Sequence, residues 1–318
     1  MVKAFFKMFD EVYLKNNNRV NEFHKTMKDG EQAEPEKKLL ERMKSYMIQS
    51  AVTNLWFCTL HGKKATFAEM KNAILLGAIT PVLDDLVDEY RLNSNEVWDA
   101  ITGNSNKLPQ KYDAAKFMYN TLNQNSDNSY KPFLSNALQS QDLSLLQLKN
   151  EKLGIDSLYK ITLKKGGQWT LLYRSILANK LIKPEIEVVL QLGGLLQITN
   201  DAFDVYKDFK NGQQTIFTNA KDIKQIYDHF KNDCINFSTN FLKMDYRRKN
   251  KFLALAMIFT ILSRAMVCQL QLIKCQVKTG NSFELEKYNR SELICDMEKP
   301  INNLRSFWLS IKFLVKII

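Results

Sequence analysis

Residues 188–208 read VVLQLGGLLQITNDAFDVYKD, an apolar run that ends in four polar ligand-type side chains. In a helix, Asn200, Asp204 and Asp208 share one face because they are four residues apart, and Asp201 lies next to that face. Unpaired charges at the end of a buried helix are costly. The pattern therefore predicts a long helix, closely packed at its Gly-Gly pair, that presents oxygen ligands to a cation.

A second acidic segment lies earlier, where residues 80–91 read TPVLDDLVDEYR. Asp84 and Asp88 share a helix face, and Asp85 with Glu89 forms an adjacent pair. Four carboxylates so close together repel one another unless a cation neutralises them, and Mg²⁺ prefers oxygen ligands. A solvated acidic patch is the alternative, but the apolar run before the segment and the presence of a matching second segment favour a metal site.

The composition is that of an all-α protein. The 318 residues include only 11 Gly and 6 Pro, whereas β proteins need frequent turn residues. We expect a single domain over residues 1–318, built as a helical bundle. Helices are predicted over residues 35–61, from Thr66 with a Thr66/Glu69 capping box, from Ser94, over 155–180, 184–210, 220–242 and 249–278, and from about Pro300, with a loop at 123–129.

The charge and the cysteines limit the partners and the compartment. The net charge of +11 favours anionic partners such as diphosphates, nucleic acid or an acidic membrane surface. The Lys and Arg residues are scattered, so we expect no nucleic acid partner. Five cysteines without a C-x-x-C pair, and an N-terminus without the pattern of a signal peptide, predict a cytoplasmic protein.

The C-terminal segment, residues 307–318, is strongly apolar and is interrupted only by Lys312 and Lys316. A last helix packed on the core fits this pattern. A peripheral contact with a membrane surface also fits it. Both interpretations stay open from the sequence.

Together the two acidic segments resemble the motifs of the class I isoprenoid synthase superfamily, whose members carry an aspartate-rich motif on one helix and a second metal motif on a facing helix. Residues 84–88 match the form D-D-x-x-D. Residues 200–208 match the spacing of the N-x-x-x-S-x-x-x-E triad of terpene cyclases, with Asp204 where Ser or Thr is usual and Asp208 where Glu is usual. They are also similar to the second motif of squalene and phytoene synthases, and their end resembles that of trans-prenyltransferases.

This resemblance implies a bundle with a central active-site cavity that holds Mg²⁺, three ions in all, and ionises a prenyl diphosphate. It also makes a homodimer possible. The catalytic residues it implies are Asp84, Asp85, Asp88, Asn200, Asp204 and Asp208. The metal ligands it implies are these six together with Glu89 and Asp201.

Basic residues would bind the diphosphate, because negative charge develops on the leaving group. Residues 164–169, KKGGQW, resemble the K-T-G region of trans-prenyltransferases at a helix break. The candidate diphosphate contacts are Lys164, Lys165, Arg174, Lys207 and Arg264.

Three functions remain open. A terpene synthase, a lyase that eliminates diphosphate, is favoured because the chain has no G-K-R-x-R-P-type segment and Arg91 stands alone after the first motif. A chain-elongating or head-to-head prenyltransferase is supported by Asp204, Asp208 and the Gly166 segment. A helical binding protein without enzymatic activity is the third.

Aromatic side chains could stabilise a carbocation, although each is more typical of plain core: Trp56, Phe57, Trp169, Tyr173 and Phe203.

Overall fold

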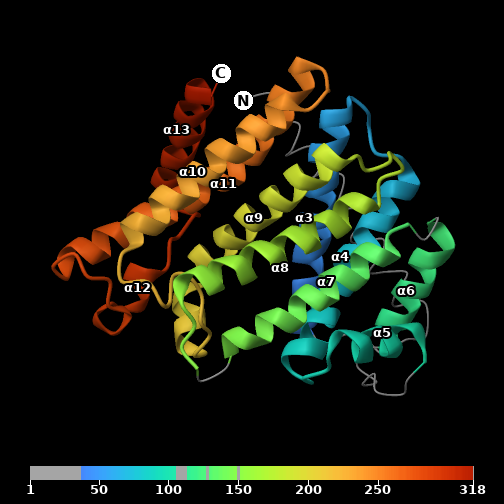
Figure 1. Ribbon diagram of the computed structural model, residues 1–318, viewed down its shortest axis with the longest axis horizontal. Helices are drawn as coiled ribbons and strands as arrows, with labels where there is room; N and C mark the ends of the chain where they lie inside the picture. The colour runs from blue at the N-terminus through green and yellow to red at the C-terminus, as the bar shows by residue number, and fades with distance from the viewer. Residues whose placement is uncertain (1–36, 105–112, 127–128, 149–150, 318) are drawn as a thin grey trace. The chain divides into compact units, whose positions relative to one another are not determined.

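The computed structural model describes residues 37–104, 113–126, 129–148 and 151–317. Within these residues it contains eleven α-helices, two short 3-10 helices and no strand (Figure 1). The prediction of an all-α protein is confirmed. The chain divides into two compact units, and the prediction of a single domain stays a prediction. Among the described residues, an N-terminal unit comprises those within 37–142 and 168–181, and a C-terminal unit comprises those within 143–167 and 182–317.

The N-terminal unit is built around the pair of helices α3 and α4. α3 ends at His61 with Gly62 in the left-handed conformation (φ 71°), as predicted, while its start was predicted at residue 35, outside the described residues. α4 begins with the predicted capping box of Thr66 and Glu69. The helices of this unit are α3 (Lys37–His61), α4 (Phe67–Asp88), α5 (Ser94–Thr102), α6 (Asp113–Asn125), most of α7 (Lys131–Ser144) and the end of α8 (Ile155–Ser175).

Gly77 sets the distance between α3 and α4. A Cβ atom at this position would lie 2.6 Å from the Met47 Cα and 2.6 Å from the Tyr46 carbonyl oxygen. No side chain fits there, so the two helix backbones touch. This contact fixes the register in which α3 presents its side chains to the acidic end of α4.

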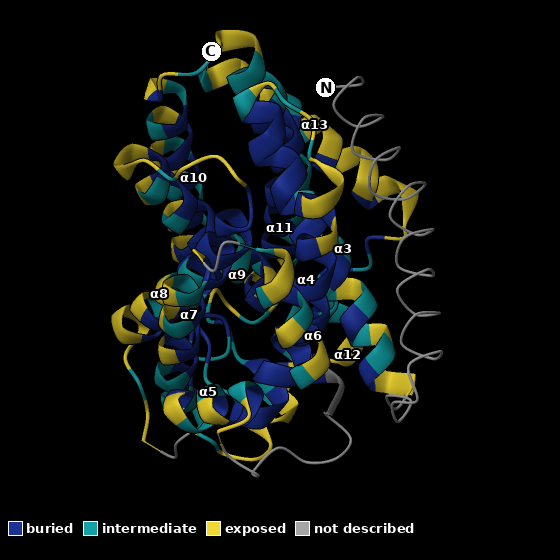
Figure 2. Cartoon of the chain, turned by 90° about the vertical axis from the view of Figure 1, so that its right-hand side faces the viewer, coloured by how far each residue is buried: buried dark blue, intermediate teal, exposed yellow. Residues whose placement is uncertain are grey.

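The C-terminal unit surrounds α11, most of which is buried (Figure 2). α11 contacts α9, α10, α12 and α13. By length and composition it could cross a membrane, and 72% of its most apolar window is buried inside the protein. The elements of this unit are the 3-10 helix Leu145–Leu148, the first part of α8, α9 (Lys183–Lys210), α10 (Ile223–Lys243), α11 (Arg248–Lys278), the 3-10 helix Leu285–Lys287, α12 (Arg290–Leu293) and α13 (Pro300–Ile317).

Glycines also bring α8 and α9 together. The backbones of Gly166 and Gly193 are in direct contact, and a Cβ at Gly194 would lie 2.5 Å from a methyl carbon of Leu163. The close packing predicted for the Gly-Gly pair of α9 is confirmed. The helix break predicted at Gly166 is wrong, because α8 runs without interruption through this position.

Two predicted boundaries differ from the structure. α6 continues to Asn125, into the predicted loop 123–129, because the Asn72 side chain donates to the Asn125 carbonyl at 3.2 Å and Tyr130 donates to the Asn123 side chain. α8 ends at Ser175 instead of residue 180. After α8 the chain is held within the N-terminal unit by Glu69, which accepts a hydrogen bond from the Ala178 amide.

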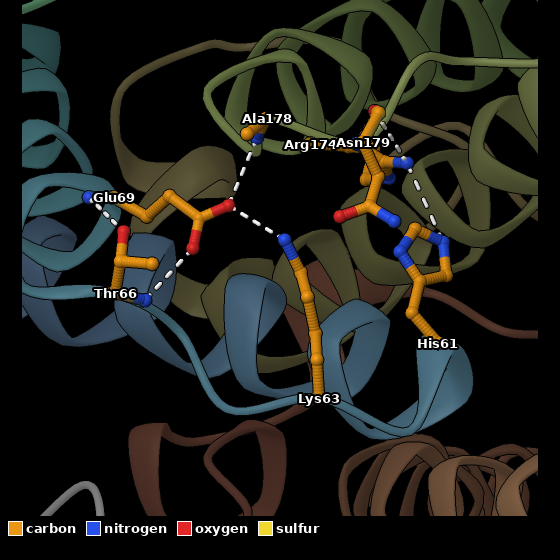
Figure 3. A network of polar contacts seen from close by, with 7 residues as sticks. All are labelled: His61, Lys63, Thr66, Glu69, Arg174, Ala178 and Asn179. Atoms are coloured by element: carbon orange, nitrogen blue, oxygen red, sulfur yellow. Dashed lines mark hydrogen bonds and ion pairs between the residues drawn. The ribbon is translucent and has the colours of Figure 1, made fainter.

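Glu69 is a buried carboxylate that joins three segments (Figure 3). It accepts hydrogen bonds from the Lys63 ammonium at 2.7 Å, the Thr66 amide at 2.8 Å and the Ala178 amide at 2.9 Å. Burial by itself would raise the pKa of Glu69, but these three donors outweigh burial and hold the pKa at about 2. Beside it, the Arg174 guanidinium donates to the Asn179 carbonyl at 3.1 and 3.2 Å.

Replacement of Gly77 by Ala is expected to destabilise the protein by about 1–3 kcal/mol or more, because the new Cβ overlaps the α3 backbone. Chemical denaturation measures this change. Gly154→Ala is the matched control, since a Cβ at Gly154 meets nothing within 4 Å and the cost is limited to a weaker helix start. Equal destabilisation by the two substitutions would contradict the proposed role of Gly77.

Glu69→Gln is expected to lower the free energy of unfolding at pH 7 by about 1–3 kcal/mol, because the buried donors lose their charged acceptor. The folded-state pKa is depressed, so the stabilisation is present above about pH 4.5 and is lost as the pH falls toward 2. The difference between wild type and variant should therefore shrink from pH 7 to pH 3. Glu41→Gln, at an exposed position of α3, should change stability at neither pH.

Candidate functional site

The first acidic segment lies at the C-terminal end of α4. Asp85 is buried and forms an ion pair with Arg42 of α3, at 2.5 Å. Asp84 is half-buried and accepts a hydrogen bond from the Tyr46 hydroxyl at 3.1 Å. Asp88 is exposed and accepts from the Gln141 amide at 3.4 Å. The charge of Asp85 is thus neutralised by Arg42. Asp84 and Asp88 are both more exposed than Asp85.

Electrostatics at this helix end favour a cation. The charge of Asp84, together with burial, raises the pKa of Tyr46, so the Tyr46 hydroxyl keeps its proton and remains a donor. The unsatisfied carbonyl groups at the C-terminus of a helix add partial negative charge to that of the carboxylates. Glu89, the C-cap residue, is exposed beside them.

Buried polar groups continue from Tyr46 along the same face of α3. Ser50 and Asn54 follow at intervals of four residues and are fully buried. The Ser50 hydroxyl and both polar atoms of the Asn54 side chain have no hydrogen-bond partner among the described residues. Such atoms are costly unless water or a ligand satisfies them.

The second acidic segment forms one face of α9. Asp201 and Asp208 are buried, each 5% exposed, and Asp204 is half-buried between them in sequence. Asp201 accepts hydrogen bonds from the Gln197 side chain at 2.9 Å and from the Thr162 hydroxyl of α8 at 3.2 Å.

Both buried carboxylates have a raised pKa. Burial raises the pKa of Asp201 to about 6, against the effect of its hydrogen bonds and of the Lys165 charge. Burial and the charges of Asp201 and Asp204 raise the pKa of Asp208 to about 7. The charges of Lys165 and Lys207 only partly offset these effects. This face of α9 would therefore be stabilised by an additional cation.

The acidic face of α9 differs from the predicted stripe in one residue. Asn200 is exposed, whereas Asp201 is buried and interacts with Asp204 and Asp208. The interacting acidic residues are therefore Asp201, Asp204 and Asp208, at i, i+3 and i+7. The predicted stripe of Asn200, Asp204 and Asp208 had the spacing i, i+4, i+8. Packing decides this rotation of α9, because the Ala202 carbonyl accepts from the Cys268 thiol of α11 at 3.0 Å and α8 covers Asp201.

The five predicted diphosphate contacts lie in different environments. Lys165 is half-buried and its charge acts on Asp201 and Asp208, and Lys207 is exposed and pairs with Asp204 at 3.2 Å. Lys164 is exposed, and Arg174 is fully buried on the Asn179 carbonyl. The structure therefore brings only Lys165 and Lys207 to the acidic face of α9.

Arg264 of α11, the fifth predicted diphosphate contact, acts on Cys295. A hydrogen bond with Cys268 and the charge of Arg264 lower the pKa of Cys295, which burial would raise.

The aromatic candidates are mostly core: Trp56, Phe57, Trp169 and Tyr173 are buried, and Phe203 is half-buried. The Tyr173 hydroxyl donates to Thr80 at 3.0 Å.

Sequence reasoning missed the residues that position the carboxylates. They are Arg42, Tyr46, Gln141 and Thr162, each on a helix other than that of its acidic partner. Arg42 and Tyr46 are one turn apart on α3, and this spacing becomes informative only once α3 is known to face α4.

The two acidic segments carry oxygen donors, but these do not converge on a single point. In the part of the chain that the structure describes, no group of three or more His, Cys, Asp or Glu side chains converges on one point. Mg²⁺ keeps several waters and commonly takes one or two carboxylates together with substrate phosphates. Asp84 and Asp88 on α4, and Asp201 and Asp208 on α9, carry carboxylate oxygens, the donor type that Mg²⁺ prefers.

Asp208→Asn is expected to stabilise the metal-free protein at pH 8 by roughly 1–3 kcal/mol, because it removes a buried charge. The folded-state pKa of Asp208 is raised, so its contribution to stability is full at pH 4 and is lost as the pH rises through 7. The variant should therefore gain at pH 8 and not at pH 4. Thermal melting in EDTA measures this, with the exposed Asp228→Asn of α10 as control. A loss of stability at pH 8 would contradict the assigned environment.

None of three comparisons with known proteins produced a match. No model of a known protein family, no curated protein and no solved structure matches the chain. The candidate site therefore rests on the residues and contacts described above.

Proposed function

We propose that the protein is a magnesium-dependent class I terpene synthase, which ionises an allylic prenyl diphosphate to a carbocation that is cyclised or deprotonated as diphosphate leaves. The proposal includes the class I fold with its central active-site cavity. One observation carries it: α9 holds Asp201 and Asp208 buried, and the nearby charges of Lys165 and Lys207 do not restore an ordinary pKa to either. Buried carboxylates with strongly perturbed pKa values cluster at functional sites.

The acidic residues have distinct roles in this proposal. Asp84 and Asp88 on α4, and Asp201, Asp204 and Asp208 on α9, would hold Mg²⁺. Magnesium bound there would supply positive charge that stabilises the departing diphosphate. Asp85 acts as a positioning residue, because its ion pair with Arg42 holds α4 against α3.

Hydrogen bonds orient the carboxylates for this task. The Tyr46 hydroxyl donates to Asp84, and the Thr162 hydroxyl and the Gln197 amide donate to Asp201. The ammonium groups of Lys165 and Lys207 can pair with phosphate oxygens, because both lie close enough to Asp208 for their charges to lower its pKa. Buried aromatic rings would exclude water from a carbocation, which water would otherwise capture.

A prenyltransferase is the second candidate, and the position of Asn200 favours it. In a triad like that of terpene cyclases, the Asn200 side chain would bind the metal. Asn200 is exposed, however, and the interacting residues are the three aspartates Asp201, Asp204 and Asp208. This composition is closer to the aspartate-rich second motif that the sequence shares with chain-elongating and head-to-head enzymes.

The decisive experiment incubates the purified chain with geranyl, farnesyl and geranylgeranyl diphosphate, in magnesium or EDTA, with and without isopentenyl diphosphate. Released diphosphate and extracted hydrocarbons are measured. We expect magnesium-dependent release from a single allylic substrate. A longer prenyl diphosphate formed only with isopentenyl diphosphate would assign the transferase instead.

Asp84→Asn and Asp201→Asn are each expected to lower the rate by about 100-fold or more, because each removes a charge that holds the metal. Asp228→Asn should leave the rate unchanged. If no substrate releases diphosphate, the enzymatic proposal fails and a binding protein is the remaining interpretation.

A further inference from the structure

The last helix, α13, has one face built into the C-terminal unit. Its buried residues include Ser306, Ser310 and Phe313. The Phe313 ring stacks on Phe259 of α11 with 4.6 Å between centroids, and the Ser306 hydroxyl lies 2.8 Å from that of Ser263. These contacts hold α13 in one rotation on α11. The same residues of α13 therefore always face away from α11.

The outer face of α13 is apolar. Side chains at successive turns point to solvent, and four of them are more than half exposed: Ile301 (52%), Leu304 (54%), Trp308 (64%) and Val315 (72%). Phe307 is 39% exposed beside them. Contiguous apolar surface of this kind marks an interaction site far more often than scattered single residues do. We call these five residues the outer apolar face.

Positive charge borders this face. Arg305, Lys312 and Lys316 are exposed and, on a helix, lie together along one edge of the outer apolar face. α13 contains no Asp or Glu. An apolar face with Trp and Phe beside a basic edge is the arrangement of helices that lie in the surface of an anionic bilayer.

From this arrangement we propose that α13 seats on the surface of an anionic lipid bilayer, with the outer apolar face in the headgroup region and the three basic residues at lipid phosphates. The 18 residues of α13 would lie along the surface for about 27 Å. Trp308 is suited to the bilayer interface because its ring is both apolar and able to donate a hydrogen bond.

A second copy of the chain fits this face less well. In a symmetric dimer with the two α13 helices packed antiparallel, the basic edges of both copies would lie on the same side, and like charges across an interface are unfavourable. An anionic surface instead complements them. This inference is independent of the proposed enzymatic function, because none of the residues in it belongs to the acidic segments.

The test uses the full chain and vesicles of phosphatidylcholine with and without phosphatidylglycerol, in a flotation assay at low salt. We expect binding to the anionic vesicles. Leu304→Ser combined with Trp308→Ser should lower the partition coefficient at least about tenfold. Lys312→Gln and Lys316→Gln should each lower it about fivefold. Phe67→Ser removes a 75% exposed aromatic residue of the N-terminal unit and should change nothing.

Fluorescence locates the contact. Of the four tryptophans, Trp56 and Trp169 are buried, Trp98 is half-buried and Trp308 is exposed. Binding should shift the emission to shorter wavelength, brominated lipids should quench it, and Trp308→Phe should remove both effects. The proposal is overturned if the anionic vesicles are not bound or if the double variant binds as well as wild type. A dimer that the double variant dissolves, without vesicle binding, would assign the face to a second copy.

Discussion

Direct contact between helix backbones at glycine keeps the helices of each unit in register. At Gly77 the α4 backbone touches that of α3, and at Gly193 the α9 backbone touches that of α8. Helices this close cannot rotate or slide without overlap, since interiors are packed as densely as crystals. The facing residues are therefore fixed in register, which is why Tyr46 meets Asp84 and Thr162 meets Asp201.

The buried carboxylates fall into two groups according to what neutralises them. Asp85 and Glu69 are matched by Arg42 and Lys63, and Glu69 also by backbone amides. These residues stabilise the fold. Asp201 and Asp208 are not matched in this way, so burial raises the pKa of each. Keeping such residues lowers the stability of the protein, and a functional site is the usual reason for a cost of this kind.

α13 illustrates how one helix can belong to both the core and the surface. Small and aromatic residues on its inner side fit α11, while larger apolar residues are left outside. The two interpretations of the C-terminal segment, core packing and membrane contact, are therefore compatible, because they concern opposite faces of the same helix.

The amino-acid sequence was sufficient to predict the all-α class, the capping box at Thr66, the end of α3 at Gly62 and the acidic segments. These features depend on local periodicity and on the conformational freedom of single residues. Tertiary packing instead sets the rotation of each helix about its own axis. It placed Asp201 inside and Asn200 outside, kept α8 continuous through Gly166, and committed Arg174 to a carbonyl group. A one-residue difference on a helix is a rotation of about 100°, and only contacts with neighbouring helices distinguish such rotations.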